Sequence, residues 1–273
     1  MSELYLEVAV AAARDAGAIL RDRYGKPHEV RFKGAVDLVT EADAAAEALI
    51  ADRLRSAFPT HRLLGEEGAR GAGGETATPY RWVVDPLDGT TNFAHGLPHF
   101  AVSIGLEEHG VPIVGVVYDP LRDELFTGCQ GAGAFLNGQP IQVSATGQLL
   151  QSILATGFSY DLRRRTGQAA AWHAFLVRVQ SIRQTGSAAL NLCYVAAGRL
   201  DGYWERGIAP WDVAAGAVIA LEASASVTNF DGGDFRADDR EVVASNGPLH
   251  DEILAILRQH APRPPVPVGE ATG

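Results

Sequence analysis

The chain has 273 residues, with 23 Lys and Arg against 33 Asp and Glu, and its formal net charge is therefore −10. The hydrophobic share of 47% excludes a wholly disordered chain, and the acidic charge argues against a protein that follows nucleic-acid phosphates. Cys129 and Cys193 are too few for a disulfide framework or a four-thiolate zinc site, so a reducing cytoplasm is expected. No uncharged apolar run approaches the roughly 20 residues that span a bilayer, so no membrane partner is expected. Because of the acidic net charge, no nucleic-acid partner is expected either.

The first third of the chain alternates between helical and extended patterns. Helices are expected over residues 4–24 and 41–58, with an extended segment between them at 28–40. A short strand at 62–64 leads into Gly65-Glu66-Glu67-Gly68. Residues 69–79 are rich in Gly, Ala, Thr and Pro, which predicts a mobile loop.

A buried strand is expected at residues 81–84, directly before the acidic sequence that starts at Asp85. An antiparallel meander follows over residues 100–143. Its apolar runs at 101–106, 111–118 and 124–127 are separated by turn residues, and the pair Asn137-Gly138 predicts a hairpin.

A second lobe is expected from about Ser144. It would contain a polar turn with Arg163, Arg164 and Arg165, strands at 153–156, 226–230 and 241–244, and helices at 168–180, 188–197, 211–223 and 249–258. The tail from Pro262 should fray. Helices that alternate with strands around an antiparallel middle predict a layered α+β fold, with lobes at 1–143 and 144–261 and a flexible tail at 262–273.

The strongest chemical signal is the sequence Asp85-Pro86-Leu87-Asp88-Gly89-Thr90-Thr91. Two carboxylates three residues apart follow a buried strand, and they repel each other unless a cation lies between them. Oxygen ligands without nearby His or Cys suit a hard cation, Mg²⁺ first. The residues from Gly89 onward resemble a helix entry whose free N–H groups can hold phosphate. The alternative is a structural Asp-Pro turn with Asp88 as a helix cap.

Three weaker signals add acids at strand ends and helix starts. In the pair Glu66-Glu67, one carboxylate could join a metal site while the other faces solvent. Asp212, after Pro210, is by itself most simply an N-cap, and Asp43 belongs to a capping-box pattern that starts at Thr40. Taken together, these acids are what a phosphatase site with several cations would use.

At this point the sequence resembles the inositol monophosphatase family of Mg²⁺-dependent, lithium-sensitive phosphatases. The resemblance covers about residues 4–258, and five motifs carry it in order: Asp37-Leu38-Val39-Thr40-Glu41-Ala42-Asp43, Gly65-Glu66-Glu67, Trp82-Val83-Val84-Asp85-Pro86-Leu87-Asp88-Gly89-Thr90-Thr91-Asn92-Phe93, Gly186-Ser187-Ala188-Ala189 and Trp211-Asp212-Val213-Ala214-Ala215-Gly216. It implies the layered αβαβα fold shared with fructose bisphosphatases. It also implies a homodimer and hydrolysis of a phosphate monoester by a metal-bound water, with inositol 1-phosphate as the expected substrate.

The resemblance also implies a role for each site residue. The first Mg²⁺ would be held by Glu66, Asp85 and the Leu87 carbonyl, the second by Asp85, Asp88 and Asp212, and a weaker third ion by Glu66 and water. Glu66 and Thr90 would orient the attacking water, with Asp43 behind Thr90. The substrate contacts would be Asp88, Gly89, Thr90, Arg183, Gly186, Ser187, Ala188, Glu205 and Asp212.

Two departures from the family pattern stand out. Gln184 follows Arg183 where many relatives carry a second basic residue, and Ser224 and Ala225 stand near a helix end where relatives carry a Gly pair. The open alternatives are a phosphatase for histidinol phosphate, a 3′-phosphonucleotide or fructose 1,6-bisphosphate, and a non-catalytic binding protein. A further alternative is a thiolate phosphatase, because Cys193 and Arg199 have its Cys-x5-Arg spacing. Such chemistry needs the Cys at a loop that opens onto a helix N-terminus, whereas Cys193 is expected inside a helix.

Overall fold

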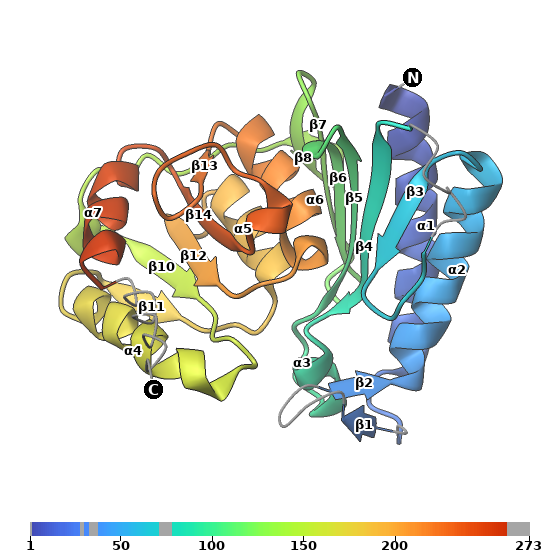
Figure 1. Cartoon of the computed structure of the whole chain (residues 1–273), viewed down its shortest axis with the longest axis horizontal. Coiled ribbons are helices and arrows are strands. Elements are labelled where there is room, and N and C mark those ends of the chain that lie inside the picture. Colours follow the sequence, from blue (N-terminus) through green and yellow to red (C-terminus); the bar gives the residue numbers. More distant parts are fainter. Residues whose placement is uncertain (1, 28–29, 33–37, 71–77, 261–273) are drawn as a thin grey trace, which may run out of the picture.

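The structure is a computed structural model that describes residues 2–27, 30–32, 38–70 and 78–260. Two large sheets and the helices around them form five layers, which Figure 1 shows from right to left. Helices α1 and α2 form the first layer, a seven-stranded sheet the second, α5 and α6 the third, a five-stranded sheet the fourth, and α4 and α7 the last. This is the layered αβαβα fold expected from the sequence.

The first layer forms because two Ala-rich helices pack closely against each other and against the sheet. Helices α1 (Ser2–Arg23) and α2 (Glu41–Ala57) match the predicted helices to within two residues. Ala9, Ala12, Ala13 and Ala16 lie at helical spacing on α1 and are fully buried. Small side chains at these positions let the helix backbones approach each other and the strands beneath them.

The seven-stranded sheet carries the predicted meander. Its strand order is β3-β4-β5-β6-β7-β8-β9. The bounds are β3 Arg62–Gly65, β4 Tyr80–Asp88, β5 Ala101–Glu108, β6 Val111–Asp119, β7 Glu124–Cys129, β8 Gly133–Leu136 and β9 Gln139–Pro140. All neighbouring strands are antiparallel except β3 and β4, which are parallel. Asn137 (φ 49°) and Gly138 (φ 77°) form the predicted hairpin turn between β8 and β9.

Strand β4 is longer than the sequence predicts. It was expected to end before Asp85, but it continues to Asp88, and its ladder with β5 shifts register between these two residues. The shift accommodates Pro86, which has no N–H to donate to the ladder. Both carboxylates are therefore anchored in the sheet instead of on a free turn.

The five-stranded sheet has the order β11-β10-β12-β14-β13. Its strands are β10 Ile153–Thr156, β11 Ser181–Arg183, β12 Gly202–Arg206, β13 Ser226–Thr228 and β14 Glu241–Ser245. Helices α5 (Ala188–Ala196) and α6 (Pro210–Glu222) fill the space between the two sheets, and α4 (Leu162–Leu176) and α7 (His250–His260) cover the outer face. Short elements complete the chain: β1 Val30–Phe32, β2 Leu38–Thr40, α3 Thr90–Ala94, η1 Leu149–Gln151 and η2 Ala237–Asp239.

Three details of the second half differ from expectation. Helix α4 begins six residues before the predicted start, because Asp161 caps it by accepting a hydrogen bond from the Arg163 N–H. The expected polar turn of three arginines is therefore the first turn of α4. Strands β11 and β12 were not predicted. After α6 the chain still makes a left-handed turn at Ser224 (φ 70°), although Ser adopts this conformation less easily than Gly.

Some expectations fall outside the part of the chain that the structure describes. These are residues 28–29 and 33–37 of the predicted extended segment, residues 71–77 of the predicted loop, and the tail from Pro262. Within the described residues, no helix has both the length and the apolar character needed to cross a membrane.

Candidate active site

A pocket of about 360 Å³ lies where both halves of the chain contribute strand ends and helix starts. The end of β4 and the start of α3 provide one side. The loop before α4, the starts of α5 and α6, and the end of β12 provide the other. Eleven of the residues predicted for the site line this pocket: Glu66, Asp85, Leu87, Asp88, Gly89, Thr90, Gly186, Ser187, Ala188, Glu205 and Asp212.

Four of the lining carboxylates interact with one another. Burial, followed by the charges of Glu66, Asp88 and Asp212, raises the pKa of Asp85 well above its usual value. Burial and the charges of Asp88 and Glu66 likewise raise the pKa of Asp212. Side chains that are this acidic, buried and close can all be ionised only if positive charge is added between them. The pocket is therefore built to attract cations.

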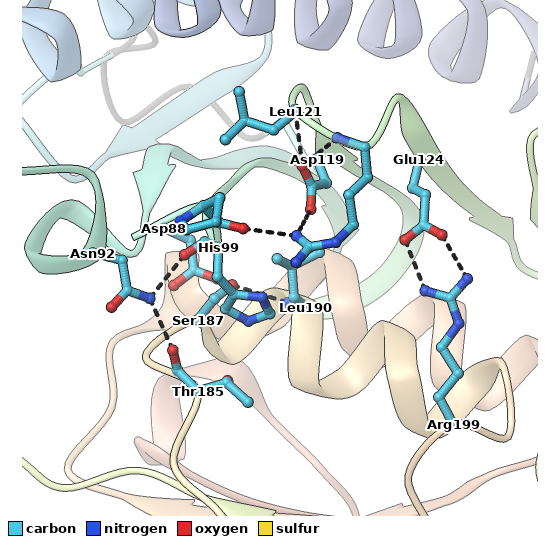
Figure 2. Close-up of polar contacts among 12 residues, drawn as sticks. Asp88, Asn92, His99, Asp119, Leu121, Glu124, Thr185, Ser187, Leu190 and Arg199 are labelled. Atoms are coloured by element: carbon cyan, nitrogen blue, oxygen red, sulfur yellow. Dashed lines mark hydrogen bonds and ion pairs between the residues drawn. The ribbon is translucent and has the colours of Figure 1, made fainter. Parts of the chain in front are cut away.

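Asp88 connects the two halves of the pocket. Its carboxylate accepts hydrogen bonds from the Ser187 hydroxyl and from the N–H groups of Ala188 (3.2 Å) and Ala189 (2.8 Å), at the start of α5. Figure 2 shows Asp88 beside Ser187. Burial raises the pKa of Asp88 to about 6, and these hydrogen bonds oppose the increase. The alternative of Asp88 as the cap of the helix that follows it is wrong, because Gly89 is the N-cap of α3 and no side chain caps that helix. Asp88 instead accepts N–H groups at the start of α5, about 100 residues away.

Thr90 and Asp43 form the predicted pair. The Thr90 hydroxyl lies 3.0 Å from Asp43 Oδ1 and 3.0 Å from the Leu87 carbonyl oxygen. The other oxygen of Asp43 accepts hydrogen bonds from the Thr40 N–H and hydroxyl, which completes the capping box at the start of α2. Asp43 does not line the pocket. It acts as a cap and also fixes the position of the Thr90 hydroxyl.

The structure separates the roles of the two neighbouring glutamates. Glu66 lines the pocket and Glu67 does not. The Glu67 and Ala69 N–H groups instead donate to the buried carboxylate of Glu47, at 2.8 and 2.7 Å. Sequence reasoning missed Glu47, which lies in the middle of α2 and folds the loop that presents Glu66.

Glu205 comes from the end of β12 and is half-buried in the wall of the pocket. Burial raises its pKa to about 7, and a hydrogen bond from the Tyr203 hydroxyl (2.7 Å) opposes the increase. A Cβ atom at Gly157 would lie only 1.9 Å from a carboxylate oxygen of Glu205. Residue 157 must therefore lack a side chain for Glu205 to occupy this position.

Asn92 holds the two halves of the pocket together, and sequence reasoning gave it no role beyond its place in a motif. Its amide donates to the carbonyl oxygens of His99 and Thr185, both at 2.8 Å (Figure 2). Gly186 has φ +86°, and a Cβ there would lie 2.8 Å from the Asn92 amide nitrogen. This glycine thus provides both the left-handed turn and the close approach that the contact needs.

Two expectations concern residues that lie away from the pocket. Arg183, expected to contact substrate, is exposed at the end of β11 and does not line it, whereas its neighbour Gln184 does. Cys193 is fully buried inside α5, and burial raises the pKa of its thiol well above the usual value. A buried, protonated thiol within a helix cannot act as a thiolate nucleophile, so the thiolate alternative is wrong.

The donor set of the pocket fits a hard divalent cation. Glu66, Asp85, Asp88 and Asp212 offer carboxylate oxygens, and no His or Cys lines the pocket within the described chain. No three His, Cys, Asp or Glu side chains of the described residues already stand as a metal-ligating group. Asp88 and Asp212 instead accept N–H donors, in the case of Asp212 from Ala209 at 2.7 Å. An ionised carboxylate has about four acceptor sites, so these side chains keep lone pairs for a cation, and the mutual repulsion of the acids favours cation binding.

Comparisons with known proteins identify a family and several relatives of this chain. Residues 1–261 match the family described as the inositol monophosphatase family. Inositol monophosphatase 3 from Solanum lycopersicum is 47% identical over 94% of this chain and 97% of its own length. The Nus factor SuhB of Escherichia coli is 44% identical over 93% of this chain and 95% of its own. The structure of inositol monophosphatase from Anabaena (Nostoc) sp. PCC 7120 has a TM-score of 0.85 at 44% identity and covers 94% of this chain and 96% of its own.

Proposed function

This chain belongs to the inositol monophosphatase family, and we propose that it is a Mg²⁺-dependent phosphomonoesterase that releases myo-inositol and phosphate from inositol 1-phosphate. One observation carries the proposal: four carboxylates from distant parts of the chain converge on one pocket beside a helix start at Gly89. Such a pocket collects cations and phosphate together, and phosphoryl transfer consists mostly of positioning and charge neutralisation.

The carboxylates would hold two Mg²⁺ ions, with a weaker third. Glu66, Asp85 and the Leu87 carbonyl would hold the first ion, and Asp85, Asp88 and Asp212 the second. Glu66 and water would hold the third. When bound, the ions neutralise phosphate charge and lower the pKa of a water molecule.

The remaining chemistry belongs to groups of this chain. Glu66 and the Thr90 hydroxyl would orient the attacking water, with Asp43 fixing the hydroxyl; the 3.0 Å contact between Thr90 and Asp43 supports this assignment. The N–H groups of Gly89 and Thr90 would hold the phosphate oxygens, since a helix start offers free N–H donors. A protein nucleophile is not needed, and Cys193 is too buried to serve as one.

The other half of the pocket would bind the polyol. We assign hydroxyl contacts to Glu205, Asp88 and Asp212, and to the chain from Gly186 to Ala188. Glu205 supports the choice of a polyol because a half-buried carboxylate is a strong acceptor for hydroxyl donors. A direct substrate contact by Arg183 has no support from the pocket lining.

Phosphate release from a panel of substrates tests the proposal. The panel consists of inositol 1-phosphate, histidinol phosphate, a 3′-phosphonucleotide and fructose 1,6-bisphosphate, each assayed with Mg²⁺ and with EDTA. We expect the highest kcat/KM for inositol 1-phosphate and no turnover in EDTA. A higher value for another panel member would replace the substrate and keep the reaction class. No release from any of them would leave a non-catalytic binding role.

We further propose that the chain acts as a cytoplasmic homodimer, without a membrane or nucleic-acid partner. The two buried free cysteines suit a reducing compartment, and the net charge of −10 opposes binding to nucleic-acid phosphates. We also propose lobes at 1–143 and 144–261, and the separation of the strands into two large sheets supports this division. Sedimentation equilibrium tests the dimer, since a monomer mass at micromolar concentration would contradict it.

A further inference from the structure

Three consecutive arginines begin helix α4, and only one of them lines the pocket. Arg163 and Arg164 have side chains that are 90% and 60% exposed, and both face Asp161. Arg165 is half-buried and lines the pocket with Ser159, Tyr160 and Gly207. The start of α4 lies on the side of the C-terminal half that faces α3 (Figure 1). Arg165 thus lines the pocket from the half opposite the end of β4, which carries Asp85.

The loop that carries Arg165 is held in place by side-chain hydrogen bonds. Gln168 accepts from the Ser159 N–H (3.0 Å) and donates to the Arg206 carbonyl (2.8 Å), which joins the loop to the end of β12. Arg165 Nε donates to the Ser159 carbonyl oxygen at 2.9 Å. One edge of the guanidinium is therefore fixed. Within the described residues, its two Nη groups have no hydrogen-bond or ion-pair partner, so they are available to a ligand.

Arg165 does not act as the counter-ion of the acidic groups. It is the only cationic side chain among the described residues that line the pocket, and all five other charged groups there are carboxylates. No described carboxylate lies within ion-pair distance of Arg165, and burial and the charge of Asp88 raise the pKa of Glu205 without any arginine. The positive charge of Arg165 thus remains available within a strongly acidic pocket.

From this geometry we propose that Arg165 binds a second anionic group of the substrate, remote from the phosphate that is released. The inference rests on the proposed function and adds to inositol 1-phosphate a second class of substrate, phosphomonoesters that carry another phosphate or a carboxylate. A guanidinium has only donors, in a fork that matches oxyanions, and a neutral polyol has no group that demands it. In a pocket of carboxylates, an anionic substrate tail needs such a local positive charge.

Matched substrate pairs test the inference. Fructose 1-phosphate and fructose 1,6-bisphosphate differ only in a second phosphate. Glucitol 6-phosphate and 6-phosphogluconate differ only in a terminal carboxylate. For wild type, Arg165→Gln, Arg165→Lys and the control Arg164→Gln, the ratio of kcat/KM within each pair is measured in Mg²⁺. Where a compound is not turned over, its inhibition constant against inositol 1-phosphate is used.

In Arg165→Gln the preference for the doubly anionic member should fall about 10- to 100-fold, the range expected for a lost charge-assisted hydrogen bond. Arg165→Lys should retain part of the preference, because it keeps the charge but not the fork. If the ratio of kcat/KM falls only for the two fructose phosphates, the site binds phosphate. If it falls only for glucitol 6-phosphate and 6-phosphogluconate, the site binds a carboxylate. Unchanged ratios in Arg165→Gln, an equal loss for all four compounds, or the same change in Arg164→Gln would overturn the inference.

Failure of the proposed function gives a different result. In that case wild-type protein releases no phosphate from these compounds or from inositol 1-phosphate, and calorimetric dissociation constants for the same pairs replace the kinetic ratios. Tighter binding of the doubly anionic members that Arg165→Gln abolishes would uphold the anion site. Equal binding of the pair members by wild type would overturn it.

Discussion

Replacing Thr90 by Ala separates catalysis from binding. Thr90 is 7% exposed, and its hydroxyl lies 3.0 Å from both Asp43 Oδ1 and the Leu87 carbonyl oxygen. Its removal takes one donor from this buried pair, which should lower the free energy of unfolding by about 1–3 kcal/mol. It also removes a group proposed to orient the attacking water, which should lower kcat by about 10²–10⁴-fold. KM should change little, because the backbone N–H that is proposed to hold the phosphate remains.

Steady-state phosphate release from inositol 1-phosphate and urea unfolding measure both effects on the same preparation. Thr90→Ser is the matched control, since it keeps the hydroxyl and loses only a methyl group. Cys193→Ser should remain active, because the buried thiol has no catalytic role here. A Thr90→Ala enzyme with normal kcat and raised KM, or a Thr90→Ser enzyme as slow as Thr90→Ala, would refute this reasoning.

Three further predictions concern the Asn92 contacts between the two halves of the pocket, the pH dependence of stability and inhibition by lithium. Asn92→Asp should lower stability by about 2–5 kcal/mol, because a carboxylate would replace the donor that joins the His99 and Thr185 carbonyls; urea unfolding that matches wild type would contradict this. Burial raises the pKa of Asp88 to about 6 and of Glu205 to about 7, so the folded metal-free protein holds protons that the unfolded chain releases near pH 4. Its free energy of unfolding should therefore fall from about pH 4 to pH 7, and Mg²⁺ should restore it at pH 8; a metal-free protein that gains stability across this window would contradict the sign. Lithium at millimolar concentration should slow turnover by occupying the second cation position, and a flat Li⁺ titration would place the chain in an insensitive branch.

Local sequence signals predicted most of the fold because they report on local physics. The Ala-rich composition of residues 4–24 predicted α1, and the Asn137-Gly138 pair predicted the β8–β9 turn. The predicted ends of helices and strands were wrong where a side-chain cap or a shift in strand register determined them. The Asp161 cap began α4 early, and β4 continued through Pro86 because its ladder with β5 shifts register there.

The candidate site was predictable as a set of residues but not as an arrangement. The acids Glu66, Asp85, Asp88 and Asp212 were found from their positions at strand ends and helix starts. Local sequence patterns could not show that Asp88 accepts N–H groups at the start of α5, because Asp88 and Ala189 are about 100 residues apart in the chain. Asn92 and Arg165 were missed as functional residues for a related reason. The partners of Asn92 are backbone carbonyl groups, and Arg165 faces an open pocket, and neither feature leaves a pattern in the sequence. The division into lobes at residue 143 stays a prediction.

The Mg²⁺ dependence of phosphate release from inositol 1-phosphate tests the central claim most directly, with Asp85→Asn beside wild type. Asp85 is proposed to contact two ions, and burial among three other acids already raises its pKa. Wild-type activity should vanish in EDTA and return on Mg²⁺ titration, while Asp85→Asn should stay inactive at any Mg²⁺ concentration. Full wild-type turnover in a metal-free preparation, or an Asp85→Asn enzyme with an unchanged Mg²⁺ titration, would contradict the account.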